Sequence, residues 1–345
     1  MSKRKLSRQQ RWRVEKIQAE RTQRAQNKDS QALKALEEGH LGAVSNGLIT
    51  AHFGRQVEVE AINGDSPGER QRCHVRANVD TLVTGDRVTW RPALNPEQEG
   101  VVEARQERDS LLARPDMRGV MKAVAANVDQ LMVVVAPEPE PFANLIDRYL
   151  VAAEASGLNP VLVINKWDLM GHASVSPQIQ QRLEEFIGVY QKIGYPVVTT
   201  STTSDQELLP LKQQLQGHTS VFVGQSGVGK SSLINHLLPG VDLRVGQLSE
   251  DTRKGRHTTT TARLFHFPAG GQLIDSPGIR EFALAYLDAE TLAAGFKEFR
   301  PFLGRCRFRD CRHQQEPGCA LLEAVAAGKI QPQRFASFQH LLNSN

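Results

Sequence analysis

The chain has 345 residues, 40% of them hydrophobic and 23% charged, which is ordinary for a globular protein of two or three domains. It contains no run of about 18 apolar residues, so the sequence predicts no membrane-spanning segment and no membrane partner. The net charge of +4 is unevenly distributed, because residues 1–28 alone carry ten basic and two acidic side chains. This basic segment has no apolar stretch behind it, which excludes a secretory signal and predicts a cytoplasmic protein.

Residues 1–40 are polar and basic and lack a convincing apolar stripe, which is typical of a tail or a marginal helix. A block of positive charge favours a polyanionic partner, because each phosphate contact releases counterions. A solvated, disordered extension accounts for the same composition, so both interpretations stay open.

Residues 41–113 consist of short runs in which polar and apolar residues alternate, separated by turn sequences such as NGDSPGE and TGD. This period of two predicts a small antiparallel β unit, a barrel of about five strands. A barrel of this size suits an oligonucleotide-binding (OB) fold. Any other small β-barrel would give the same pattern.

Residues 114–290 alternate compact apolar runs with helical segments, and the runs are LMVVVA, PVLVIN, PVVTTS, SVFVG and QLIDSPG. Such runs are typical of buried parallel strands, so we expect a doubly wound α/β domain. Helices are predicted over 142–157 and 177–194, each ending at a glycine. Residues 291–345 are predicted to be helical except for a segment rich in cysteine.

A phosphate-loop sequence follows the predicted strand 220–223 and precedes a helical segment. It matches G-x-x-x-x-G-K-[ST] and comprises Gly224, Gln225, Ser226, Gly227, Val228, Gly229, Lys230, Ser231 and Ser232. The glycines allow backbone N–H groups to surround the β-phosphate of a nucleotide. Lys230 would bring a positive charge to the β and γ oxygens during catalysis, and the Ser231 hydroxyl would bind Mg²⁺.

The sequence NKWD at the end of another predicted strand indicates which base is bound. The carboxylate of Asp168 can accept two parallel hydrogen bonds, which matches the N1–H and the exocyclic amine of guanine but not adenine. Lys166 would pack along the base and the phosphate loop, and Asn165 would connect the two motifs. Ser201, which follows PVVTT, is a further candidate for contact with the base.

A D-x-x-G motif, DSPG, ends the last predicted strand. Asp275 would hold Mg²⁺ through water, and the N–H of Gly278 would contact the γ-phosphate. In the preceding segment 255–260, Thr258 or Thr259 would complete the magnesium shell, and the sequence does not decide between them. NKWD, phosphate loop and DSPG stand in permuted order, which a sheet tolerates because domain termini often lie close together.

The C-terminal segment places three cysteines and one histidine within 14 residues. Cys306, Cys311, His313 and Cys319 form a closed set with no open position, which predicts one structural zinc ion. Reduced thiols beside an incidental histidine are the alternative. The arginines around Phe308 suit either an RNA-facing surface or a solvated one.

This order of motifs resembles the circularly permuted small-ribosomal-subunit biogenesis GTPases, the RsgA (YjeQ) family, over about residues 40–345. The resemblance implies an OB-fold barrel at 41–113, a permuted P-loop GTPase at 114–290 and a helical zinc-binding domain at 291–345. It also implies that the chain acts in late maturation of the small (30S) subunit. It further implies rRNA binding and GTP hydrolysis that the subunit stimulates.

Ile279 follows DSPG where Ras-like enzymes carry a water-orienting glutamine, which is similar to the hydrophobic substitution of this family. We therefore take His257 as the candidate that places the water, while a histidine that only packs or contacts RNA is the alternative. Such a site should be slow alone and faster on its partner. The rival functions are a P-loop ATPase, disfavoured by NKWD, and a non-catalytic rRNA-binding assembly factor, disfavoured by intact phosphate and magnesium residues. We expect a monomer.

Overall fold

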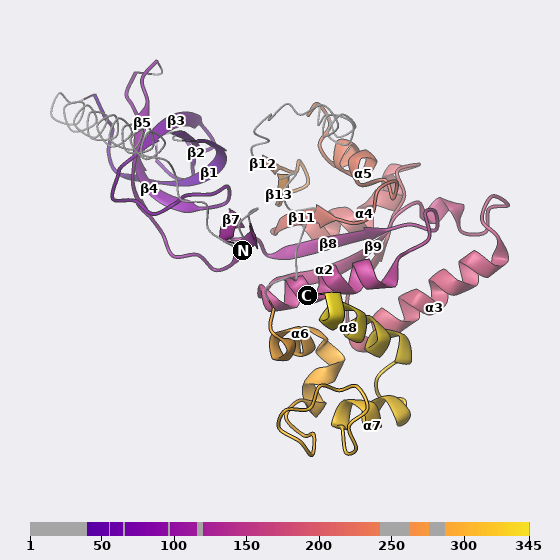
Figure 1. Ribbon diagram of the computed structural model, residues 1–345. Coiled ribbons are helices and arrows are strands. Elements are labelled where there is room, and N and C mark those ends of the chain that lie inside the picture. Colours follow the sequence, from indigo (N-terminus) through magenta and orange to yellow (C-terminus); the bar gives the residue numbers. More distant parts are fainter. Residues whose placement is uncertain are drawn as a thin grey trace, which may run out of the picture. The chain divides into compact units, whose positions relative to one another are not determined.

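The computed structural model describes residues 40–54, 56–64, 66–95, 97–115, 120–241, 262–275 and 287–344. The chain divides into two compact units, one ending at Arg108 and the other beginning at Asp109, and each is described by itself (Figure 1). In the described part of the chain, no helix has the length and apolarity needed to cross a bilayer. The domain limits given above stay predictions.

The first unit is a closed five-stranded barrel, as predicted. Its strands are β1 (Ser45–Phe53), β2 (Gln56–Ala61), β3 (Arg70–Val75), β4 (Arg87–Arg91) and β5 (Gly100–Arg105). They pair in the order β1-β2-β3-β5-β4, and an additional β1–β4 pairing closes the barrel. Alternate residues of the strands face inward and form one core, which contains Ile49, Val57, Val59, Cys73, Leu82, Val88, Trp90 and Val102.

Two strand glycines allow the barrel to close. A Cβ at Gly47 would lie 2.3 Å from a methyl carbon of Val59 and 2.7 Å from the indole nitrogen of Trp90. A Cβ at Gly100 would lie 2.8 Å from the carbonyl oxygen of Arg91. Because neither position has room for a side chain, glycine is required at both.

The second unit contains a twisted sheet with the strand order β10-β9-β8-β11-β13-β12. The strands are β8 (Gln130–Val135), β9 (Asn159–Ile164), β10 (Val197–Thr199), β11 (Thr219–Val223), β12 (Arg263–His266) and β13 (Gln272–Asp275). All neighbours are parallel except β12, which runs antiparallel to β13. A separate hairpin of β6 (Leu111–Pro115) and β7 (Met121–Ala126) precedes β8.

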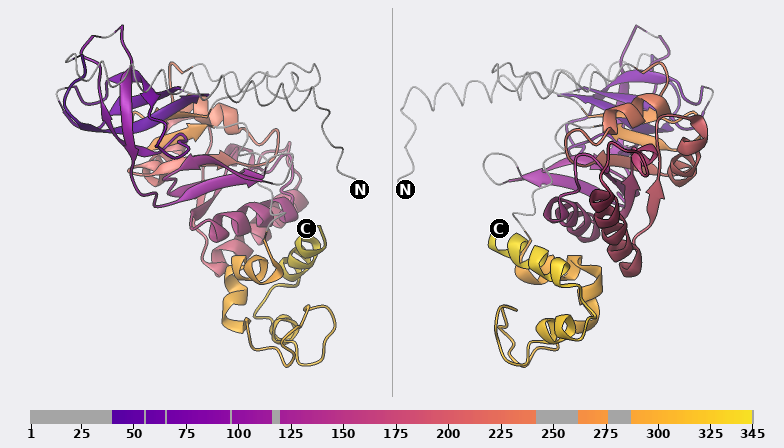
Figure 2. Two further views of the ribbon diagram at one scale, coloured as in Figure 1. Left: turned by 60° about the vertical axis from the view of Figure 1, so that its left-hand side comes forward. Right: turned by 90° about the vertical axis from the view of Figure 1, so that its right-hand side faces the viewer.

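Helices cover both faces of this sheet, which confirms the predicted α/β fold (Figures 1 and 2). On one face, α4 (Asp205–Leu215) and α5 (Lys230–Leu237) bury their leucines against β8, β9 and β11. On the other face lies α2 (Ala143–Ala155). The helix α3 (Pro177–Ile193) begins at its N-cap Ser176 and ends at Gly194, whose φ of 94° is left-handed.

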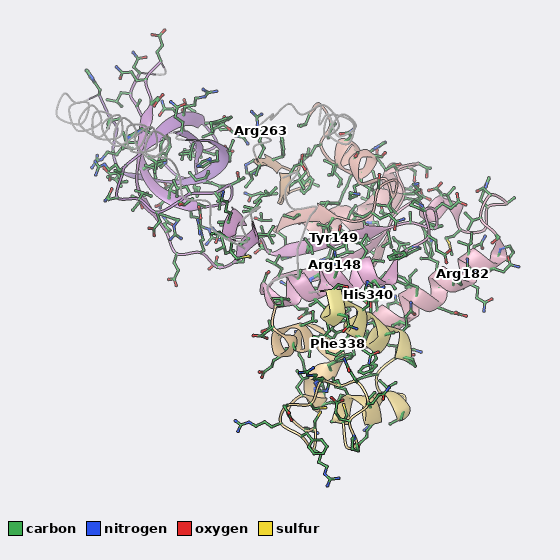
Figure 3. The ribbon with its side chains drawn as sticks, viewed as in Figure 1. Arg148, Tyr149, Arg182, Arg263, Phe338 and His340 are labelled. Carbon is green, nitrogen blue, oxygen red and sulfur yellow. The ribbon has the colours of Figure 1, made fainter. Side chains whose placement is uncertain are left out.

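The C-terminal region consists of α6 (Ala289–Gly295), the 3₁₀ helix η4 (Lys297–Phe302), α7 (Ala320–Ala326) and α8 (Pro332–Ser344). Its core is aromatic and includes Phe338 of α8 (Figure 3). Phe338 is edge-on to Phe296 and Phe299 at centroid distances of 5.6 and 5.4 Å. Both α6 and α8 pack on α2, on the side that faces away from the sheet (Figure 1).

A buried ion pair joins α2 to α8. Arg334 is 1% exposed and Asp147 is fully buried, and the guanidinium of Arg334 donates to the carboxylate of Asp147. Arg334 also donates to Glu298 over 2.7 Å, and the Tyr190 hydroxyl donates to Asp147 over 2.5 Å. Burial opposes the charge of Arg334, but the carboxylates of Asp147 and Glu298 outweigh it and raise the pKa of the guanidinium.

Candidate functional site

The motifs that the sequence analysis singled out lie at one edge of the sheet. The NKWD segment follows β9, Ser201 follows β10, the phosphate loop follows β11, and Asp275 ends β13. These strands are parallel, so their carboxyl ends meet at the same edge. The chain passes from β8 to its neighbour on one side and from β11 to strands on the other side. In α/β proteins, ligands bind at the carboxyl ends of the strands where the connections diverge in this way.

Two side chains of NKWD bond directly to the phosphate loop. The amide of Asn165 donates to the carbonyl oxygen of Val228 over 2.8 Å, and Asn165 is 2% exposed. The ammonium of Lys166 donates to the carbonyl oxygen of Gly227 over 2.7 Å. The segments 165–168 and 224–232, separated by more than fifty residues in sequence, therefore form one site.

The carboxylate of Asp168 is held from the side opposite the phosphate loop. The Ser201 hydroxyl donates to Asp168 Oδ1 over 2.5 Å, and the backbone N–H of Trp167 donates to the carbonyl oxygen of Thr200 over 3.1 Å. Ser201 is buried, whereas Asp168 lies on the short 3₁₀ helix η1 (Trp167–Leu169), which has no buried residue. Asp168 is thus fixed in orientation and still accessible to a ligand.

The phosphate loop has the geometry that its glycines predict. Gly224, Gly227 and Gly229 all have positive φ, of 143°, 85° and 89°. A Cβ at Gly224 would lie 2.2 Å from the carbonyl oxygen of Val134, and one at Gly229 would lie 2.3 Å from the Asn165 amide nitrogen. Non-glycine residues at these two positions would therefore both strain the backbone and collide with β8 and NKWD.

Lys230 is the first residue of α5, so the helix amino terminus opens directly onto the loop. Its ammonium donates to the carbonyl oxygens of Gly224 and Gln225 over 2.8 and 2.6 Å. Ser226 and Ser232 are exposed, and Ser231 is half-buried in the first turn of α5. A cation and helical N–H groups thus converge where an anionic phosphate would bind.

Of the candidate magnesium ligands, Ser231 and Asp275 are described by the structure. Asp275 is half-buried at the carboxyl end of β13, beside the strand that leads into the phosphate loop. Their hydroxyl and carboxylate oxygens are ligands that Mg²⁺ prefers. Gly278, His257, Thr258 and Thr259 lie outside the described residues, as does Ile279.

The connection after β8 is a part of this site that the sequence did not indicate. The ammonium of Lys166 also donates to the carbonyl oxygen of Glu138 over 2.9 Å, and a Cβ at Gly227 would lie 3.5 Å from the ring of Pro139. No side-chain motif marks this segment. Only its position in the sheet could have indicated its role, because β8 lies between the strands that carry NKWD and the phosphate loop.

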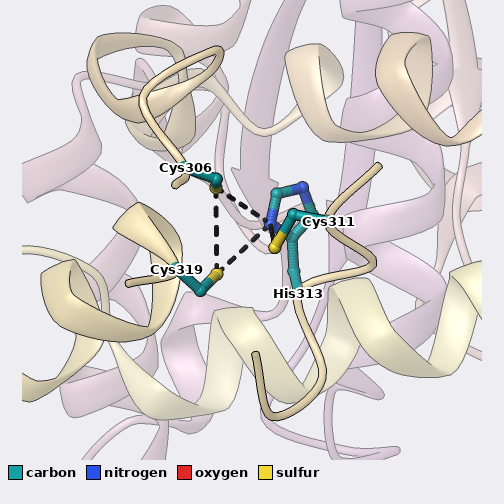
Figure 4. Close-up of side chains that lie close together, drawn as sticks. All are labelled: Cys306, Cys311, His313 and Cys319. Atoms are coloured by element: carbon teal, nitrogen blue, oxygen red, sulfur yellow. Dashed lines mark hydrogen bonds between the residues drawn. The ribbon is translucent and has the colours of Figure 1, made fainter. Parts of the chain in front are cut away.

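The second candidate site is a cluster of Cys306, Cys311, His313 and Cys319, whose potential ligand atoms all lie within 4.8 Å of one another (Figure 4). His313 Nδ1 is 3.6, 3.6 and 3.3 Å from the three sulfurs in sequence order. Tetrahedral zinc with bonds of about 2.3 Å to sulfur and about 2.0 Å to nitrogen places S and N about 3.5 Å apart. The set therefore fits a tetrahedral metal ion.

Two interactions organise the loops around this cluster. The N–H of Arg307 donates to the carbonyl oxygen of Gly318 over 2.9 Å, which joins the loops of Cys306 and Cys319. The carboxylate of Glu316 accepts N–H groups of Arg312, Gln314 and Gln315, and these bonds hold its pKa at about 2. Desolvation raises the pKa of the Cys311 thiol to about 12, a tendency that a bound cation reverses.

Comparison with known proteins assigns these features to one family. The model of the RsgA GTPase family matches residues 105–285. The small ribosomal subunit biogenesis GTPase RsgA of Ectopseudomonas mendocina is 58% identical over 344 residues, which cover all of this chain and 98% of that protein.

Two solved structures share the fold. YjeQ from Thermotoga maritima is 33% identical with a TM-score of 0.71, and the alignment covers 88% of this chain and 98% of that one. YloQ, described as a circularly permuted GTPase, is 28% identical with a TM-score of 0.68 and coverages of 88% and 96%. With a joined NKWD and phosphate loop, a closed barrel and a Cys₃His cluster, this chain belongs to the RsgA family of circularly permuted GTPases.

Proposed function

We propose that the chain hydrolyses GTP to GDP and phosphate and acts in the biogenesis of the small ribosomal subunit. The observation that carries the GTPase assignment is the pair of bonds from Asn165 and Lys166 to the carbonyl oxygens of Val228 and Gly227. These bonds unite a guanine-reading motif with a phosphate-binding loop in one pocket. The role in subunit biogenesis follows from the name of the relative that is 58% identical to this chain.

Guanine selection would depend on Asp168. Its carboxylate would accept the N1–H and the exocyclic amine of the base, and adenine offers no matching pair of donors. Ser201 would hold the carboxylate in this orientation and contribute its backbone near the base. Lys166 would lie along the base, as its bonds to the loop backbone favour.

Hydrolysis transfers the γ-phosphoryl group to water, so catalysis consists mainly of positioning and charge neutralisation. Lys230 would exchange its bonds to loop carbonyls for bonds to the β and γ oxygens. Ser231, Asp275 and Thr258 or Thr259 would hold Mg²⁺, which neutralises phosphate charge when bound. The N–H of Gly278 would contact the γ-phosphate, and His257 would place the attacking water. The residues 225, 226 and 232 would complete the phosphate cradle.

The partners would be the small ribosomal subunit and its rRNA, late in the maturation of that subunit, with hydrolysis stimulated on it. The basic N-terminal segment supports rRNA contact, because positive charge suits a polyanionic surface. The closed five-stranded barrel supports it as well, because oligonucleotide-binding folds have this architecture. Cys306, Cys311, His313 and Cys319 would hold one zinc ion, which stabilises the C-terminal loops when bound. The chain would act in the cytoplasm as a monomer.

The test of this function is GTP turnover measured with and without purified small subunits. Wild-type protein should be slow alone and faster with subunits, whereas Lys230→Ala should show no turnover in either condition. Equal turnover of wild type and Lys230→Ala would overturn the catalytic assignment. If saturating small subunits did not stimulate turnover, the proposed partner would be overturned and the GTPase assignment would stand.

Base selection is tested by displacement of fluorescent GDP. Wild-type protein should release it to GTP but not to equimolar ATP, and equal displacement would favour the ATPase alternative. Asp168→Asn should shift preference toward xanthosine nucleotides, because the amide offers a donor where xanthine has an oxygen. Asp205→Asn is the matched control, since that side chain is 92% exposed. Unchanged GTP selectivity in Asp168→Asn would remove Asp168 from the site.

A further inference from the structure

Two side chains lie next to the guanine-reading motif in a row of closely spaced oxygen atoms. Ser201 Oγ, which donates to Asp168 Oδ1, lies 3.0 Å from Thr203 Oγ1. Thr203 Oγ1 in turn donates to Glu207 Oε2 over 2.5 Å. A continuous row of side-chain oxygens therefore leads from the Asp168 carboxylate to the first turn of α4.

The donors available in this row determine the direction of its hydrogen bonds. Ionised carboxylates only accept, so the proton of Ser201 goes to Asp168 and the proton of Thr203 goes to Glu207. The backbone N–H of Thr203 also donates to Ser201 Oγ over 3.2 Å. Since both hydroxyl protons go to carboxylates, the contact between the two hydroxyl oxygens carries no hydrogen bond, and the backbone N–H is the link from Thr203 to Ser201.

The helix α4 anchors the far end of the row. The N-cap Ser204 accepts the N–H of Glu207 over 3.4 Å, which fixes the backbone of Glu207. The hydroxyl of Thr200 donates to the carbonyl oxygen of Glu207 over 3.0 Å. The loop that carries Ser201 and Thr203 is thus tied to α4 by backbone and by side chain.

We propose that Thr203 and Glu207 are positioning residues that orient Asp168 through Ser201 and so sharpen the selection of guanine over bases without the exocyclic amine. This inference rests on the proposed role of Asp168 in reading the base. Two parallel hydrogen bonds require the carboxylate to be coplanar with the base edge. A carboxylate released by Ser201 keeps one bond by rotation and loses the second, so the amine stops contributing to affinity.

The ratio of the affinities for GDP and IDP measures this effect, because hypoxanthine keeps the N1–H of guanine and lacks its amine. Thr203→Val removes, at nearly constant volume, the hydroxyl whose bond to Glu207 holds the Thr203 backbone N–H against Ser201. It should lower the GDP to IDP ratio by about threefold to tenfold, the range of one hydrogen bond. Thr203→Ser restores the hydroxyl and should return the ratio to within about twofold of wild type. Glu207→Gln keeps an acceptor oxygen and should have a smaller effect than Thr203→Val.

Thr202→Val is the matched control, since the Thr202 hydroxyl makes no hydrogen bond to the part of the chain that the structure describes. An unchanged GDP to IDP ratio in Thr203→Val would overturn this inference, while a wild-type preference for GDP over ADP would leave the proposed function standing. Equal weakening of GDP and IDP, with a lowered melting temperature, would also overturn it, because Thr203 would then only support the fold. Absence of the preference for GDP over ADP in the wild type would instead refute the function itself.

Discussion

Removal of the Asn165 side chain should weaken nucleotide binding. Asn165→Ala takes away the 2.8 Å bond to the carbonyl oxygen of Val228, in a place where Asn165 is 2% and Val228 1% exposed. A buried polar group that loses its partner costs about 1–3 kcal/mol. If the loop must keep this shape to bind phosphate, the same energy corresponds to about a fivefold to 150-fold loss of affinity.

Titration with fluorescent GDP measures the affinity, and urea unfolding without nucleotide measures the stability of the free protein. Asn159→Ala is the matched control, because Asn159 begins the strand that Asn165 follows. The Asn159 amide donates to the carbonyl oxygen of Asp129 over 3.2 Å at an exposed position. This control should change GDP affinity by less than about twofold, as surface substitutions usually do.

A GDP affinity of Asn165→Ala within about twofold of wild type would refute the reasoning, since it would mean that the phosphate loop keeps its shape without NKWD. Gly229→Ala provides an independent check, because its Cβ would lie 2.3 Å from the same amide nitrogen. It should weaken GDP binding at least as much as Asn165→Ala does. Normal binding by Gly229→Ala would contradict the contact itself.

Three further predictions follow from the other parts of the chain. Purified protein should contain about one zinc ion per chain, and removal of the metal by a chelator should make the segment from Cys306 to Cys319 sensitive to proteases. Purified protein that contains no metal would refute the zinc site. Arg334→Leu leaves Asp147 buried without its cation and should lower the free energy of unfolding by about 3–5 kcal/mol, and a loss under about 1 kcal/mol in urea unfolding would contradict the burial of this pair. Deletion of residues 1–28, with their ten basic side chains, should weaken subunit binding and flatten its dependence on salt; an unchanged salt slope would place the phosphate contacts elsewhere.

The barrel, the α/β sheet and the nucleotide-binding motifs could be predicted from the sequence, because each produces a pattern among residues that are close together in the chain. Alternation predicted the barrel strands, and the apolar runs predicted β8, β9 and β11. The phosphate loop was predicted to precede a helix, and α5 begins at Lys230. The predicted tie between Asn165 and the phosphate loop is present in the structure.

Contacts between distant segments could not be predicted in this way. The helix over 142–157 was predicted from its apolar positions, but it also buries Asp147, whose partner Arg334 lies 187 residues later. A carboxylate on an amphipathic helix is usually exposed, so nothing local indicated this burial.

The packing of α2 between the sheet and the C-terminal helices limits how this chain can be dissected experimentally. A truncation before α6 would expose to water the outer side of α2, which α6 and α8 cover in the full chain, and would remove the arginine that pairs with Asp147. Such a fragment would lose the packing on one side of α2, so we expect it to be less stable than the full chain and a poor minimal nucleotide-hydrolysing core. Phenotypes of C-terminal truncations would then report loss of the whole second unit, and only point substitutions can separate its activities.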